Sequence, residues 1–95
     1  MKKMTAVLAG NTLQAASWFR NKAERETGTF DSLRLEFLDM QGNRWRYVPT
    51  AHAARGIDWT DMKLIGTWGE RTDEAAHELY DVVYDACRRT ELLAK

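Results

Sequence analysis

Two short apolar runs in this sequence each end in a glycine that polar residues follow. The first runs from Thr5 to Ala9 before Gly10, and the second runs from Met62 to Ile65 before Gly66. A buried strand, a tight turn and a helix start, in that order, form the ligand-binding edge of many α/β sheets. We therefore expect strands over 5–9 and 63–67 that lie side by side and parallel.

Length, composition and charge indicate one small domain over residues 1–95. The chain is 44% hydrophobic, and its single cysteine cannot form an intrachain disulfide. No apolar run approaches the roughly 20 residues of a membrane span, so we expect a cytoplasmic protein without a membrane contact. The 14 basic and 14 acidic residues give a net charge of zero, which argues against a dedicated nucleic-acid binder and permits a homo-oligomer.

Two amphipathic helices are predicted. The first spans about 12–26, where Asn11 and Gln14 have the form of a capping box and Gly28 closes the helix. Its expected apolar face holds Leu13, Ala16, Phe19 and Ala23, and its polar side holds Arg20, Lys22, Glu24 and Arg25. The second begins at 72 or 73, runs to about 93, and carries acids first and arginines last, as the helix dipole favours. Its expected apolar face holds Ala76, Leu79, Tyr80, Val83 and Cys87.

A β-hairpin is predicted between these helices. Residues 33–38 alternate with a period of two, residues 39–43 form the loop, and Pro49 ends the second strand. A short helical segment over 50–55 follows. The predicted order is β-α-β-β-(short α)-β-α, an α/β or mixed α+β fold with helices packed on a four-stranded mixed sheet. The two glycine-ended strands are expected in its centre, and 33–38 at an antiparallel edge.

The ends of the two central strands are the predicted ligand site, and helix N-termini there would direct amides towards a phosphate or carboxylate. The candidate ligand-binding residues are Asn11, Thr12, Gln14, Thr67, Trp68 and Arg71. The same residues would also serve as helix caps, a turn and a packed tryptophan, which is a purely structural alternative. No known phosphate-binding loop is present, so a phosphorylated small molecule is the expected ligand class and no cofactor is assigned.

Catalytic and metal-binding residues are not predicted. His52 and His77 lie far apart in the sequence, and Cys87 stands alone, so the short spacing of metal ligands is missing. Cys87 also falls on the apolar face of the last helix, where a buried and unreactive thiol is expected. The sequence therefore favours a protein that is not an enzyme.

The segment Arg44-Trp45-Arg46-Tyr47 is a weak candidate for binding nucleic acid or an acidic partner. Arginines beside aromatic side chains are typical of single-stranded nucleic-acid binding. On a strand, however, Arg44 and Arg46 point to one face and the aromatic residues to the other. This geometry favours Trp45 and Tyr47 packed against a helix, with both arginines in solvent.

Four short segments together resemble a group of small, uncharacterised bacteriophage and prophage proteins. They are Ala9-Gly10-Asn11, Trp45-Arg46-Tyr47-Val48, Ala54-Arg55-Gly56 and the segment from Leu64 to Arg71. The chain departs from that group at Gly69, where an aromatic residue often stands, and in its added strand over 33–38. The resemblance implies a phage or mobile-element origin and action in a bacterial cytoplasm, but no activity.

Three functions follow from these observations. The first is a non-enzymatic accessory protein that binds a host or defence protein through an exposed patch with Trp18 or Trp59, without a deep pocket. The second is a small-ligand or nucleotide binder, or an enzyme, that uses the ends of the central strands. The third and weakest is a nucleic-acid binder that uses Arg44 and Arg46.

Overall fold

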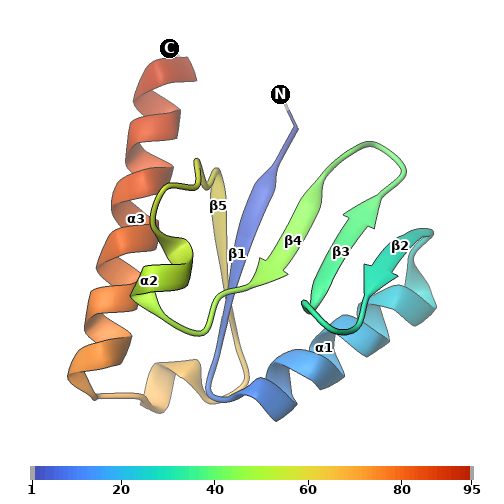
Figure 1. Ribbon diagram of the computed structural model, residues 1–95, viewed down its shortest axis with the longest axis horizontal. Coiled ribbons are helices and arrows are strands. Elements are labelled where there is room, and N and C mark those ends of the chain that lie inside the picture. The colour runs from blue at the N-terminus through green and yellow to red at the C-terminus, as the bar shows by residue number, and fades with distance from the viewer. Residues whose placement is uncertain (1, 95) are drawn as a thin grey trace.

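The computed structural model describes residues 2–94 and contains one five-stranded mixed sheet in the order β2-β3-β4-β1-β5 (Figure 1). The strands are β1 (Met4–Ala9), β2 (Gly28–Asp31), β3 (Glu36–Asp39), β4 (Arg44–Tyr47) and β5 (Asp61–Ile65). The helices are α1 (Thr12–Arg25), α2 (Ala51–Ala54) and α3 (Glu74–Ala94), with a 3-10 turn, η1 (Trp68–Glu70), after β5. β1 pairs in parallel with both β4 and β5, whereas β2, β3 and β4 are antiparallel. The mixed sheet, the hairpin and the helices are thus confirmed.

The prediction of four strands was wrong, because the chain forms a fifth strand directly after α1. Gly28 does not close the helix but starts β2, where a Cβ atom would collide with the carbonyl of Leu38 and the ring of Phe37. The first half of the expected strand over 33–38 is a turn that the carboxylate of Asp31 stabilises by accepting two backbone hydrogen bonds. Leu35 has a positive φ of 52°, which ends any strand geometry there.

The second glycine-ended strand lies at the edge of the sheet and not in its centre. β4 occupies the other side of β1, so β5 has one neighbour only. Lys63 and Leu64 are therefore exposed, although a fully buried strand was expected. The two strands are nevertheless adjacent and parallel, as predicted, with Ala9 beside Ile65.

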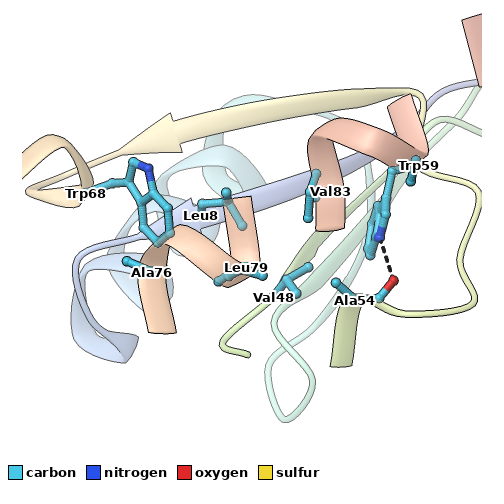
Figure 2. Packing of buried hydrophobic residues seen from close by; sticks show 10 residues of the cluster. Leu8, Val48, Ala54, Trp59, Trp68, Ala76, Leu79 and Val83 are labelled. Atoms are coloured by element: carbon cyan, nitrogen blue, oxygen red, sulfur yellow. Dashed lines mark hydrogen bonds between the residues drawn. The ribbon is translucent and has the colours of Figure 1, made fainter. Parts of the chain in front are cut away.

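Each face of the sheet carries one hydrophobic core. Figure 1 shows α2 and α3 gathered beside β5 and β1, while α1 extends from β1 towards β2. The α3 side is built from Ala6, Leu8, Val48, Ala54, Trp59, Trp68, Ala76, Leu79, Val83 and Ala86. Trp59 is fully buried there, so its predicted place in an exposed patch was wrong. Figure 2 shows its indole beside Val83, with the Nε1–H donating to the carbonyl of Ala54 at 3.0 Å.

On the other face, α1 presents a different side to the sheet than the spacing predicted. Leu13 is 82% exposed, whereas Lys22, expected on the polar side, is buried. The Lys22 ammonium lies 3.7 Å from the centre of the Trp45 ring and 2.7 Å from a carboxylate oxygen of Glu26. Because an aromatic ring face attracts a cation and the carboxylate neutralises it, a buried lysine is stable in this position.

Replacement of Trp59 by phenylalanine should destabilise the fold more than the same change at the half-buried Trp18. Trp59→Phe removes the hydrogen bond to Ala54 and leaves a void in the core, so we expect a loss of about 1–3 kcal/mol. Trp18→Phe should cost less than about 1 kcal/mol. Urea unfolding followed by circular dichroism measures both values, and equal losses would contradict the packing described.

Candidate functional site

The predicted ligand site, at the ends of β1 and β5, is held together by the side chain of Gln14. Its Oε1 accepts hydrogen bonds from the backbone N–H groups of Gly10 and Thr67, both at 3.0 Å. Its Nε2 donates to Oγ1 of Thr67 at 3.0 Å. One amide side chain therefore joins the two strand ends, and it uses both backbone donors that would otherwise face an anion at this edge.

The two glycines that follow the strands make room for this amide. A Cβ atom on Gly10 would collide with Oγ1 of Thr67 and with Oε1 of Gln14, and a Cβ atom on Gly66 would collide with the Gln14 amide. Gly66 also has a φ of 57°, which other residues adopt only under strain. The glycines are thus explained by the close approach of Gln14, without a ligand.

The start of α1 accounts for the next two candidate residues. Oδ1 of Asn11 accepts from the backbone N–H of Gln14 at 2.9 Å, so the first half of the predicted capping box is confirmed. The second half differs, because the Gln14 side chain reaches Gly10 and Thr67. Oγ1 of Thr12 lies 3.3 Å from the hydroxyl of Tyr47, at the end of β4. Tyr47 therefore belongs to this edge, which the sequence did not indicate.

The last two candidates pack on each other after β5. Trp68 is buried in the α3-side core, and the guanidinium carbon of Arg71 lies 5.0 Å from the centre of its ring. Arg71 donates two hydrogen bonds to Asp73, at 2.8 and 3.1 Å, and these lower the pKa of the Asp73 carboxyl to about 2. The bonds to Asp73 raise the pKa of Arg71, with a smaller contribution from Tyr47. Arg71 is thus held in an ion pair.

The helix after the second glycine-ended strand starts close to the predicted residue 72 or 73, so its N-terminus does not lie directly at the strand end. After Gly66 the chain forms η1, and α3 begins at Glu74. Asp73 caps α3, since its Oδ2 accepts from the backbone N–H of Ala76 at 3.1 Å. The burial of Trp68 requires the turn before the helix. Only the N-terminus of α1 therefore follows a strand of this edge directly.

Arg44 and Arg46 both form ion pairs with Glu36 on the neighbouring strand. The nitrogen–oxygen distances are 2.8 Å for Arg44 and 3.2 Å for Arg46, and the Glu36 side chain is largely buried. Trp45 and Tyr47 point to the opposite face and pack against the α1-side core, as the alternation predicted. One carboxylate is shared between the two cations, so part of the positive charge of this pair is already neutralised.

Exposed apolar side chains lie beside the edge of β5 on both faces of the sheet. A groove of about 430 Å³ lies between α1 and the end of β5, with Leu13, Trp18 and Ile65 among its lining residues. On the other face, Leu64 is 47% exposed and Tyr84 of α3 is 44% exposed. We name Leu13, Trp18, Leu64, Ile65 and Tyr84 the β5 surface. An unpaired strand edge with apolar flanks is a typical place for another chain to bind.

Tyr84 shares one side of α3 with Tyr80 and Cys87. Tyr80, Tyr84 and Cys87 recur at helical spacing, and the two tyrosine rings stack with centres 5.9 Å apart. Burial raises the pKa of the Cys87 thiol, and the nearby carboxylate of Asp61 raises it further. A thiol whose pKa is raised in this way stays protonated at neutral pH.

A second hollow, of about 570 Å³, lies between α2 and the C-terminal half of α3, away from the predicted ligand site. Its lining includes Arg55, Arg88, Arg89 and the apolar Val82 and Leu92. Within residues 2–94, no three His, Cys, Asp or Glu side chains lie close enough together to hold a metal ion. Among the helices of this described part, none is long and apolar enough to cross a membrane.

Comparisons with protein-family models, with curated proteins and with solved structures find no match to this chain. The functional argument therefore depends on the geometry of the strand ends and of the β5 surface.

Truncation of Gln14 should destabilise the protein, because two backbone donors lose their acceptor. For Gln14→Ala we expect a loss of about 1–3 kcal/mol in the free energy of unfolding. Gln14→Glu keeps an oxygen for Gly10 and Thr67 and should cost clearly less. Chemical denaturation of both variants tests this, and an equal loss in the two would show that the accepting oxygen is unimportant.

Proposed function

We propose that this protein is a non-enzymatic accessory protein of a phage or mobile element that acts by binding a bacterial host or defence protein. The β5 surface is the proposed contact site. The observation that carries the proposal is the free edge of β5, which has exposed apolar side chains on both faces. Strand addition at such an edge supplies backbone hydrogen bonds, and the flanking side chains supply apolar contact and specificity.

Binding at the β5 surface would bury the exposed side chains of Leu13, Leu64 and Tyr84, whereas Ile65 is already buried. Leu13, Trp18 and Ile65 flank the edge on the α1 side, and Leu64 and Tyr84 flank it on the α3 side. Burial of apolar area contributes about 25 cal/mol per Å², and buried aromatic residues often dominate interface energies. The β5 surface thus supplies both the free backbone and the apolar area that a protein partner requires.

A small-ligand site at the strand ends has weaker support. Gln14 occupies the backbone donors of Gly10 and Thr67, and Asp73 holds Arg71, so a phosphate would have to displace both contacts. A rise in melting temperature with inorganic phosphate that Arg71→Ala removes would favour this alternative. Nucleic-acid binding through Arg44 and Arg46 is weaker still, because Glu36 pairs with both.

The phage-like segments give the reason to search for the partner in bacteria. They include the segment from Leu64 to Arg71, whose first two residues belong to the β5 surface. The proposed place of action is the bacterial cytoplasm.

A photo-crosslinking amino acid at Leu13 tests the proposed contact site in living bacteria. The matched control is Leu33, which is 96% exposed and lies beyond β2 at the opposite edge of the sheet. We expect a crosslinked bacterial protein from position 13 in several-fold excess over position 33, since only the first lies on the β5 surface.

Two results would contradict the proposal. Equal or absent crosslinking at the two positions would exclude the β5 surface as the contact site. A crosslink from position 13 that contains only a second copy of this chain would exclude a host partner there. Mass spectrometry of the adducts separates these outcomes.

A further inference from the structure

We propose that the protein partner binds β5 through an extended segment that pairs antiparallel with it and carries an acidic residue opposite Lys63. The residues opposite Met62, Leu64 and Ile65 are apolar, so the segment reads apolar-apolar-acidic-apolar from its N-terminus. The inference rests on the proposed function, because it gives the chemistry of the partner at the same β5 surface. The observations that carry it are the outward-facing backbone groups of β5, the exposed charge of Lys63 and the groove beside Ile65.

The hydrogen bonds of β1 determine which backbone groups of β5 face outwards. The backbone N–H groups of Arg44 and Val48 donate to the carbonyls of Lys3 and Val7, at 2.9 and 3.1 Å. The odd-numbered residues of β1 therefore direct their backbone groups to β4. Because the backbone groups of a strand alternate in direction, the even-numbered residues of β1 face β5.

The outward-facing residues of β5 follow from the register of the two strands. Ala6 lies beside Met62, and Leu8 lies beside Leu64. In a parallel pair, a residue that faces its neighbour bonds to the residues before and after the one beside it. Ala6 and Leu8 therefore bond to the residues that flank Met62 and Leu64. Met62 and Leu64 themselves direct their N–H and C=O groups away from the sheet.

An antiparallel segment satisfies these outward-facing groups. Met62 and Leu64 would each exchange two backbone hydrogen bonds with the residue directly opposite. Antiparallel pairing is also the more stable kind per residue, and largely parallel sheets often carry an antiparallel strand at an edge. The other half of this sheet already has such a pair, between β3 and β4.

Lys63 favours an acidic residue in the segment. Its side chain is exposed and forms no ion pair with any residue of the range 2–94. Lys63 lies between the two outward-facing residues, so it forms a non-hydrogen-bonded pair with the residue opposite, where side chains approach most closely. Opposite charges are favourable in such a pair and like charges are unfavourable. Since an edge lysine also discourages non-specific strand pairing, the acidic residue makes the contact selective.

Apolar residues are expected beside the acidic one. Leu64 is 47% exposed on the α3 side, and an apolar residue opposite it would cover its side chain. Ile65 lines the groove of about 430 Å³ on the α1 side, together with Leu13 and Trp18. The residue opposite Ile65 therefore lies next to this groove, which is large enough for an apolar side chain. Burial of this apolar area supplies affinity in addition to the backbone hydrogen bonds.

Two labelled synthetic peptides test the proposed segment by fluorescence anisotropy. Their centres read Leu-Val-Glu-Ile and Leu-Val-Lys-Ile, and both carry the same polar flanks. The wild-type chain should bind the glutamate peptide about fivefold more tightly than the lysine peptide, because only glutamate attracts Lys63. The Lys63→Glu variant should reverse this preference.

Arg34→Glu is the matched control, because it makes the same change of charge in the turn between β2 and β3, at the opposite edge of the sheet. The Arg34 side chain is 77% exposed, so the variant should fold and keep the wild-type preference. Circular dichroism checks that both variants are folded. The reversed peptide, with the centre Ile-Glu-Val-Leu, presents the side chains in the order that a parallel segment requires and should bind more weakly.

Three results would overturn the inference: no binding of the glutamate peptide at millimolar concentration, a preference that Lys63→Glu does not reverse, or tighter binding of the reversed peptide. A bacterial protein that still crosslinks from position 13 after such a result would leave the proposed function intact. Binding of the glutamate peptide without any crosslink in bacteria would support the inference and contradict the proposed host partner.

Discussion

The hydrogen bonds of the Gln14 side chain join the ends of β1 and β5, and the rest of this edge of the sheet depends on them. Gly10 and Gly66 lack side chains because the Gln14 amide lies against them, and Thr67 supplies both a backbone donor and a hydroxyl to it. Glycine-ended strands that lead into helices form the ligand-binding edge of many α/β sheets. Here an amide side chain of the protein takes the place that the ligand's oxygen would occupy.

This internal pairing changes where function is expected. The charged and polar groups at the strand ends have partners within the chain: Arg71 with Asp73, Thr12 with Tyr47, and Asn11 with the backbone of α1. The outer edge of β5 has unpaired backbone groups and apolar neighbours instead. The polar groups at the strand ends are already hydrogen-bonded, and the outer edge of β5 is not. The molecule is therefore better suited to bind another strand than a small ligand.

Much of the fold could be predicted from the sequence, because it depends on local patterns. The capping residue Asn11 and the dipole-matched charges of the last helix placed α1 and α3, and the alternation around Trp45 placed the hairpin. The strand order was less accessible, since β2 is four residues long with a single large apolar residue, Phe30, and its position depends on contacts with β3. The sequence did not predict β2 and did not place β4 beside β1. The prediction therefore put β5 in the centre of the sheet.

The elements that carry the candidate residues could be predicted, but the bonding partners of these residues could not. Gln14 is three residues after Asn11, which indicates a cap, yet its contact with Thr67 joins segments 53 positions apart. Lys63 indicated the exposed edge, because it is a charged residue inside a run that was expected to be buried. Leu13 gave no such signal, because its exposure depends on how α1 is rotated against the sheet.

Amide hydrogen exchange measured by NMR on dilute protein tests the central claim, a closed pair of strand ends and an open β5 edge, most directly. The amides of Met62 and Leu64 point away from β1 and should exchange rapidly, while those of Lys63 and Ile65 donate to β1 and should be protected. The amides of Gly10 and Thr67 should also be protected, because Gln14 accepts from both. Protection of Met62 and Leu64, or fast exchange of Gly10 and Thr67, would contradict the account.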